Sequence, residues 1–263
     1  MAGLEIKIAD GIATLTINNP PQNRLSNELM AGFMDVVRRV NEDRDIRVLL
    51  VRADGPNFSF GGDISRWLEL GPGEMHDQLA AAIQLFNAFE QLPVPVVAAV
   101  QGRCLGGGFE LVLRADVIIA SEKAVFGHPE QSLGVVTLLG GVQRVAERAG
   151  RTRAMRWALT SEHVSAAEMH AAGVITEIAL DGYLDDVANT WVARLAKGPT
   201  RAHAGHKKML GAWATGGIEA ADELLPAMAE ELIQTTDARR GIASAQDALR
   251  RGVERPVLKF DGK

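Results

Sequence analysis

Two glutamates are the residues of this sequence best suited to acid–base chemistry. Glu110 follows the glycines at 106–108 and falls in the first turn of an otherwise apolar predicted helix, where a carboxylate is costly unless it is hydrogen-bonded or catalytic. Glu130 comes directly after Pro129, in a second turn. Burial raises the pKa of a carboxyl group, so two glutamates that reach one apolar cavity can divide the roles of general acid and general base. Taken singly, either glutamate is more simply explained as a cap or a surface charge.

Two glycine-rich corners could direct backbone N–H groups into the same cavity. One is the run at 106–108, where a buried strand turns into the helix that carries Glu110, and the other is Gly61-Gly62. Glycine permits close approach to the backbone, and the start of a helix exposes unpaired N–H groups. Neither corner has the spacing of a nucleotide-phosphate loop. Two N–H donors on one oxygen would stabilise an enolate, because losing one such donor typically costs about a hundredfold in rate; alternatively, the glycines only permit tight packing of helix on sheet.

The elements that must position these residues alternate between predicted strands and helices. Residues 4–8 and 12–17 alternate apolar and polar positions around the turn Asp10-Gly11, which predicts a β-hairpin. Helical spacing predicts a helix over 26–41, N-capped by Ser26, and another over 74–92 that ends before Pro93. The continuous apolar runs at 48–51 and 96–100 predict buried strands. This rhythm is typical of an α/β fold with a largely parallel sheet covered by helices.

The sequence beyond residue 150 is mostly helical in pattern. Ser165 to Glu168 reads as a capping box and Gly173 as the residue that ends a short helix, with a last strand expected over 174–178. A later helical segment carries apolar side chains at helical spacing that could pack on another subunit, which predicts an oligomer. These apolar residues are Leu224, Leu225, Met228, Leu232 and Ile233.

Composition excludes several classes of function. The net charge of −5, without long basic runs, argues against a nucleic-acid partner. The single cysteine, Cys104, rules out an intrachain disulfide and favours a reducing compartment, for which we expect the cytoplasm. The N-terminus lacks a signal-peptide pattern, and no apolar run approaches the roughly 20 residues needed to cross a bilayer. His203 and His206 have no partner at metal-binding spacing, so no metal is expected.

The chain resembles the crotonase superfamily of enoyl-CoA hydratases and isomerases over nearly its full length. The motifs that carry this resemblance are Asn18-Asn-Pro-Pro-Gln-Asn-Arg-Leu25, Phe58-Ser-Phe-Gly-Gly-Asp-Ile64, Gln101-Gly-Arg-Cys-Leu-Gly-Gly-Gly-Phe-Glu110, Phe126-Gly-His-Pro-Glu-Gln-Ser-Leu-Gly134 and Gly140-Gly-Val-Gln-Arg144. The resemblance implies a crotonase-like spiral of ββα units with the CoA groove and active site in residues 1–195. It also implies a helical C-terminal trimerisation module in residues 196–263, and assembly as a homotrimer or a dimer of trimers.

The resemblance assigns catalytic roles by position. The two oxyanion-hole amides of the family fall on Gly62 and Gly107, and the two glutamates of its hydratases match Glu110 and Glu130. Relatives with other chemistry often keep only one of these glutamates, so the pair favours syn addition of water to a 2-enoyl-CoA through a thioester enolate. Which glutamate acts as acid and which as base is left open. Coenzyme A enters as part of the acyl-CoA substrate, and no prosthetic group is expected.

The resemblance also indicates where the substrate binds. Coenzyme A is expected along backbone groups at 21–25 and 63–66, with Arg24, Arg66 and Lys259 as candidate phosphate partners or, equally, ordinary surface charges. The expected contacts in these two segments are Pro21, Asn23, Arg24, Leu25, Asp63, Ile64 and Arg66.

One segment departs from the family pattern. Thr137, Leu138 and Leu139 replace the usual Pro-Gly-small turn, so we expect Thr137 and Leu138 to form a bulkier wall of the acyl site and to disfavour a simple straight-chain substrate. His128 either lines the same pocket or is a structural histidine with its hydrogen bonds satisfied.

Other functions are compatible with the same residues. Δ3,Δ2-enoyl-CoA isomerisation, thioester hydrolysis and ring chemistry on an alicyclic acyl-CoA would each use the same oxyanion site. A noncatalytic CoA-binding scaffold would keep the fold without turnover, although the retention of both glutamates argues against it. RNA binding is disfavoured by the negative net charge.

Overall fold

A β-hairpin opens the chain, as the alternation of apolar residues predicts. In the computed structural model, which describes residues 3–263, β1 (Leu4–Ala9) pairs antiparallel with β2 (Ile12–Ile17). β2 then pairs in parallel with β3 (Val48–Ala53), and β3 with β4 (Val96–Val100). The strands predicted at 48–51 and 96–100 are therefore confirmed.

The strands form two sheets of unequal size. The larger has the order β1-β2-β3-β4-β6-β9 and is completed by β6 (Val117–Ser121) and β9 (Glu177–Ala179). The smaller has the order β5-β7-β8, from β5 (Arg103–Leu105), β7 (Val125–Gly127) and β8 (Val164–Ser165). The strand predicted over 174–178 begins only at Glu177. The turn at Gly173 (φ +80°) is followed by a bend, and the chain joins the sheet only where the Thr176 amide donates to the Ile118 carbonyl.

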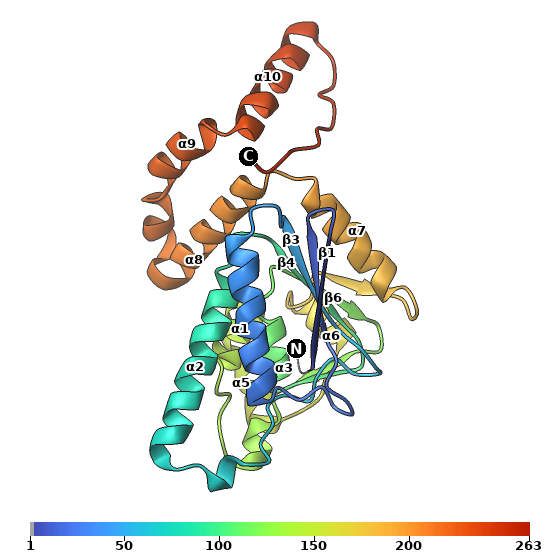
Figure 1. Ribbon diagram of the computed structural model, residues 1–263, viewed down its shortest axis with the longest axis vertical. Helices are drawn as coiled ribbons and strands as arrows, with labels where there is room; N and C mark the ends of the chain where they lie inside the picture. The colour runs from blue at the N-terminus through green and yellow to red at the C-terminus, as the bar shows by residue number, and fades with distance from the viewer. Residues whose placement is uncertain (1–2) are drawn as a thin grey trace.

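Helices cover the larger sheet on both faces (Figure 1). α1 (Asn27–Glu42) is capped as predicted, since the Leu29 amide donates to Ser26 Oγ at 3.2 Å. α2 (Pro72–Glu90) packs beside it through Phe33 and Phe89, whose ring centroids are 5.2 Å apart. The remaining helices of the core are α3 (Gly107–Val112), α4 (Gly141–Ala149), α5 (Arg151–Thr160), α6 (Ala166–Ala171) and α7 (Leu184–Ala196).

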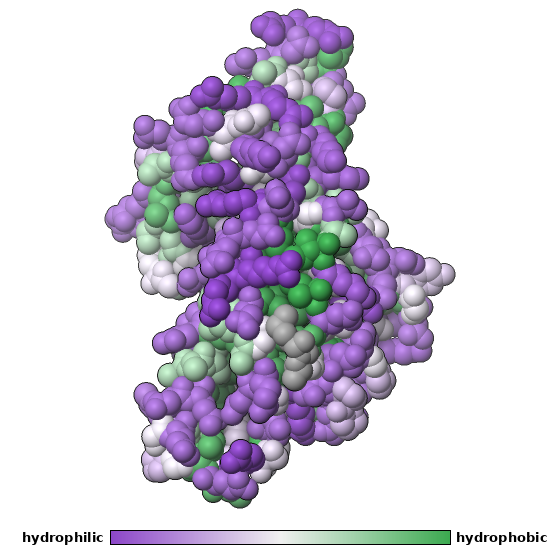
Figure 2. Space-filling view, in the orientation of Figure 1, coloured by the Kyte–Doolittle hydropathy of each residue, from purple (hydrophilic) through white to green (hydrophobic). Residues whose placement is uncertain are grey.

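Three further helices form an arm that projects beyond the sheet (Figure 1). They are α8 (Thr200–Asp222), α9 (Leu225–Ile233) and α10 (Thr236–Arg251). No residue of α9 is buried, and hydrophobic side chains show on the surface over α8 and α9 (Figure 2). This exposure agrees with the expected oligomerisation module, while the division at residue 195 and the trimer stay predictions.

The two sheets together bring distant segments to the active-site region. β4 is buried along its whole length, and the short strands β5 and β7 run parallel beside one another beyond its end. The Gly106 amide donates to the Gly127 carbonyl at 3.0 Å, which draws the start of α3 against the short 3₁₀ helix η2 (Pro129–Leu133). Glu110 and Glu130 therefore converge although they belong to different elements.

Candidate active site

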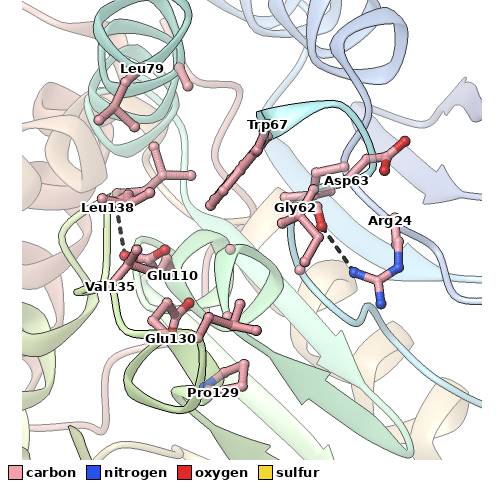
Figure 3. A pocket seen from close by; sticks show the side chains of 18 of the residues that line it. Arg24, Gly62, Asp63, Trp67, Leu79, Glu110, Pro129, Glu130, Val135 and Leu138 are labelled. Atoms are coloured by element: carbon pink, nitrogen blue, oxygen red, sulfur yellow. Dashed lines mark hydrogen bonds between the residues drawn. The ribbon is translucent and has the colours of Figure 1, made fainter. Parts of the chain in front are cut away.

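A single cavity of about 310 Å³ contains both glutamates (Figure 3). Figure 3 shows Glu110 and Glu130 side by side at its base, with Trp67 and Gly62 to one side and Leu138 to the other. Most of the remaining lining is apolar and comes from α1, α2, β5, η2 and the loops next to them. These apolar lining residues are Leu25, Met30, Phe60, Ile64, Met75, Leu79, Ala82, Leu105, Pro129, Leu133, Val135 and Leu139.

Glu110 is held by two backbone amides. The N–H groups of Leu139 and Gly141 donate to Glu110 Oε1 at 2.8 and 2.9 Å, and the side chain is only 2% exposed. Burial raises the pKa of Glu110, while the two amides and then the charges of Arg114 and Arg144 oppose that rise. The site therefore contains donors that favour the ionised form of this carboxyl group.

Glu130 has a contrasting environment. Its Oε2 is buried and has no hydrogen-bond partner within residues 3–263. Burial, with a further contribution from the negative charge of Glu110, raises the pKa of Glu130 to about 7. A carboxyl group with this pKa can hold a proton at neutral pH and give it up during a reaction.

The amides of Gly62 and Gly107 lie beside one another. A Cβ built on Gly107 would be 3.4 Å from the Gly62 nitrogen, and neither amide donates to a protein acceptor in the described part of the chain. Gly61 makes this arrangement possible: it has φ +94°, and a Cβ there would lie 3.0 Å from the Leu105 carbonyl oxygen and 3.1 Å from the Gly107 nitrogen. The two predicted corners thus meet, and the sequence did not reveal that Gly61 is the residue on which their meeting depends.

Gly106 has a similar role next to Glu130. Its φ is +51°, and a Cβ there would lie 2.8 Å from Glu130 Oε1. The first glycine of the run therefore makes room for the carboxyl group, the second provides the free amide, and the third, Gly108, allows contact with Ser59, 2.6 Å from a built Cβ.

Five of the predicted substrate contacts line the cavity: Arg24, Leu25, Asp63, Ile64 and Leu138. Arg24 also has protein partners, since its guanidinium donates to the Gly62 carbonyl at 3.0 Å and to Gln22 Oε1 at 2.7 Å. The first contact links Arg24 to the loop segment that carries the Gly62 amide.

The other predicted contacts do not line the cavity. Asn23 is buried and its side-chain amide donates to the carbonyls of Asp54 and Asn57, so it joins two loops. Arg66 is exposed and pairs with Glu69. The short 3₁₀ helix η1 (Trp67–Glu69) follows Asp63, whose carboxylate accepts from the Ser65 amide. Pro21 and Lys259 likewise lie outside the lining.

His128 is a buried, neutral residue behind the site. Its ring centroid is 5.0 Å from that of Phe109, and burial lowers the pKa of His128 to about 4. Both ring nitrogens of His128 lack a hydrogen-bond partner in residues 3–263. His128 therefore neither lines the cavity nor has its hydrogen bonds satisfied, so neither of the two expectations for it is confirmed. Thr137 also stays outside the cavity lining, and its Oγ1 accepts from the Val142 amide at the start of α4.

The cavity wall that α2 contributes was not predicted from the sequence. Met75, Leu79 and Ala82 all line the cavity, and their i, i+4, i+7 spacing places them on one face of the helix. That spacing was visible in the sequence, but nothing local distinguishes a face that lines a cavity from one that packs in the core. Trp67 had no such signal, because its 3₁₀ helix spans only three residues and is too short to show a periodic pattern.

The described residues show neither a metal cluster nor a membrane span. No group of three or more His, Cys, Asp or Glu side chains in residues 3–263 could hold a metal ion. No helix within the same range is both long enough and apolar enough to cross a membrane.

Two buried carboxyl groups and two free backbone amides line one cavity, and comparison with known proteins supports an enzyme of the crotonase type. A Streptomyces coelicolor A3(2) protein assigned as an enoyl-CoA hydratase superposes with a TM-score of 0.90 at 28% identity, covering 99% of this chain and 94% of that one. The family model "Enoyl-CoA hydratase/isomerase" matches residues 7–254. The chain belongs to the enoyl-CoA hydratase/isomerase family and has a crotonase-like fold.

Relatives in this family carry out different reactions. The chain is 32% identical to the peroxisomal fatty acid beta-oxidation multifunctional protein of Arabidopsis thaliana over 72% of its own length, but this match spans only 26% of that longer protein. It is 34% identical to the (7aS)-7a-methyl-1,5-dioxo-2,3,5,6,7,7a-hexahydro-1H-indene-carboxyl-CoA hydrolase of Rhodococcus jostii, over 73% of this chain and 74% of the hydrolase. Family membership therefore leaves the particular reaction to the chemistry of the site.

Proposed function

We propose that this protein is an enoyl-CoA hydratase-type lyase that adds water in syn fashion to a 2-enoyl-CoA. The observation that carries the proposal is the convergence of Glu110 and Glu130 in one apolar cavity with the free amides of Gly62 and Gly107. Coenzyme A would bind as part of the substrate, and the residues at the site need no metal or prosthetic group for this reaction.

The contrast between the two glutamates suggests how they divide the work. The thioester oxygen would accept from the Gly62 and Gly107 amides, which stabilise the enolate that forms when water adds to Cβ. Glu110, whose Oε1 is held by two amides, would take the proton from water through Oε2, since it is the carboxyl group with donors around it. Glu130, with a pKa of about 7, would give its proton to Cα. Each turnover moves one proton from water to Glu110 and one from Glu130 to carbon, and exchange with solvent restores both carboxyl groups.

The setting of the enzyme is part of the same proposal. The single cysteine, Cys104, cannot form an intrachain disulfide and is compatible with a reducing compartment, for which we propose the cytoplasm. The exposed apolar side chains of the α8–α10 arm support assembly as a homotrimer or a dimer of trimers. No nucleic acid and no membrane take part in the proposed function.

A panel of acyl-CoA thioesters incubated in H₂¹⁸O tests the reaction. We expect crotonyl-CoA or a longer 2-enoyl-CoA to give a 3-hydroxyacyl-CoA that carries the label, detected by mass spectrometry. Glu110→Gln and Glu130→Gln should each abolish this product. An unlabelled product formed from a 3-enoyl-CoA would instead identify an isomerase, and turnover unchanged in both variants would identify a noncatalytic CoA-binding protein.

Hydrolysis of an alicyclic acyl-CoA is the second candidate. It is favoured by the similarity to the Rhodococcus jostii hydrolase and by the leucine wall at 138–139, which replaces a glycine-containing turn. The same panel separates thioester hydrolysis from hydration, because only thioester hydrolysis releases free coenzyme A, which a thiol reagent detects. Hydrolytic opening of the ring leaves the thioester intact and is recognised by mass spectrometry, because the alicyclic acyl-CoA gains one labelled water.

A further inference from the structure

Arg114 is a buried arginine that the proposed chemistry does not use. It lies one turn after Glu110 and is 3% exposed. Its guanidinium donates to Asn87 Oδ1 at 2.8 Å, to Glu90 Oε2 at 2.9 Å and to the Leu139 carbonyl at 2.7 Å. A single side chain thus joins α2 to the loop before α4, beneath the cavity.

The loop that Arg114 holds is the one that holds Glu110. The Leu139 amide donates to Glu110 Oε1, and the carbonyl of the same residue accepts from Arg114. The next donor to Glu110 is the Gly141 amide. Arg114 therefore binds the carbonyl that lies between the two amides on which the position of Glu110 depends.

A second arginine completes the arrangement. Arg144 donates to the Gly140 carbonyl at 3.2 Å and, through Nε, to Glu90 Oε1 at 2.8 Å. Two successive carbonyls, of Leu139 and Gly140, are thus bound by two arginines that share Glu90 as their counter-charge. An arginine fork suits this task, because it holds a carboxylate and a carbonyl at fixed angles.

We propose that Arg114 is a positioning residue that, together with Glu90 and Arg144, locks the 139–141 backbone onto Glu110 and helps to keep this glutamate ionised. The claim about the backbone stands on the contacts alone. The claim about turnover rests on the proposed function.

The charges around Glu110 determine the expected direction of the effect. Arg114 and Arg144 both oppose the rise in the pKa of Glu110, whereas Glu130 is a second carboxyl group beside it. His128, near the start of α4, is neutral, because burial lowers its pKa to about 4. Burial also lowers the pKa of Arg114, to about 10, so Arg114 keeps its charge at neutral pH. Removing that charge should therefore raise the pKa of Glu110.

The test compares Arg114→Met, Arg114→Lys and the control Arg148→Met. Arg148 donates to the carbonyls of Leu113 and Ala115 and so is another arginine bound to buried backbone, but it does not touch the 139–141 loop. The first readout is hydrogen exchange of the amides at 139–141, measured by mass spectrometry. We expect Arg114→Met to speed this exchange by about tenfold or more, since it frees the loop locally, and Arg148→Met to leave it unchanged.

The second readout is the pH dependence of turnover. In Arg114→Met we expect kcat to fall by about tenfold with little change in KM, and the acid limb of the kcat profile to move to higher pH by on the order of one pH unit. Arg114→Lys keeps the buried charge opposite Glu90 and protects the fold. It should restore the acid limb while kcat recovers only in part, because a lysine cannot bind Glu90 and the Leu139 carbonyl as a fork does.

Three results would overturn the proposal. Unchanged exchange at 139–141 in Arg114→Met, or equally fast exchange in Arg148→Met, would show that Arg114 does not hold this loop specifically. Faster exchange with an unchanged kcat and acid limb would remove its catalytic role. If the wild-type protein turned over no acyl-CoA, the proposed function would fail, and the exchange comparison would still decide whether Arg114 positions the loop.

Discussion

Replacing Gly61 by alanine would test whether the amides of Gly62 and Gly107 form a working oxyanion hole. At φ +94° an alanine is strained, and its Cβ would lie 3.0 Å from the Leu105 carbonyl oxygen and 3.1 Å from the Gly107 nitrogen. Both of these atoms belong to backbone, so the contact cannot be relieved by turning a side chain. The segment around Gly61 must therefore shift away from the start of α3, which separates the two amides.

The magnitude follows from two separate effects. Backbone strain at a positive φ costs on the order of 1–3 kcal/mol of stability. Loss of one aligned oxyanion donor typically lowers kcat by about a hundredfold to a thousandfold. We therefore expect Gly61→Ala to stay folded but to lose roughly two orders of magnitude in kcat, a loss much larger than its destabilisation would explain.

Gly55→Ala is the matched control. Gly55 has a similar φ of +83°, but a Cβ there would meet nothing within 4 Å. The Gly55→Ala variant should therefore have the backbone strain without any displacement of neighbouring backbone. We expect it to have a lower melting temperature than the wild type and an unchanged kcat. The assay is kcat for the best acyl-CoA of the panel, together with thermal unfolding of both variants. If Gly61→Ala retained kcat within about twofold of the wild type, the pair of amides could not be the oxyanion hole described above.

Three shorter predictions address other parts of the structure. Burial raises the pKa of Glu130 from 4.5 to about 7, so as the pH rises the unfolded chain releases this proton before the folded protein does. The free energy of unfolding of the wild type should therefore fall as the pH rises from 4.5 to 7, by on the order of 3 kcal/mol at most. Denaturant unfolding should show no such contribution in Glu130→Gln. Asp237 accepts from the amides of Asp261 and Gly262, so Asp237→Ala should speed hydrogen exchange in the C-terminal tail and cost about 1–3 kcal/mol in denaturant unfolding; unchanged tail exchange would refute this role. Leu138→Ala should improve kcat/KM for a bulky acyl-CoA relative to crotonyl-CoA by about tenfold, and an unchanged ratio would show that Leu138 does not bound the acyl group.

Local chemistry explains why much of the fold was predictable. Alternation around Asp10-Gly11 predicted the hairpin, and the hydroxyl of Ser26 capped the helix where the apolar spacing placed it. In each case the residues that determine the element are close neighbours in the chain. The prediction at 174–178 was less accurate, because the start of β9 is set by pairing with β6 across the sheet.

The candidate site divides in the same way. The sequence by itself singled out Glu110, Glu130 and the two glycine corners as candidates for the chemistry, and the resemblance to the crotonase superfamily assigned them their expected roles. Only the tertiary structure decided how they are used. It showed that Gly61 allows the two glycine corners to meet. It also showed that the Leu139 and Gly141 amides hold Glu110, whereas Glu130 has an oxygen without a hydrogen-bond partner in residues 3–263. Arg114 binds the Leu139 carbonyl in the loop that holds Glu110. Each of these features depends on groups from separate elements, whose distances and dielectric surroundings arise only when the chain packs.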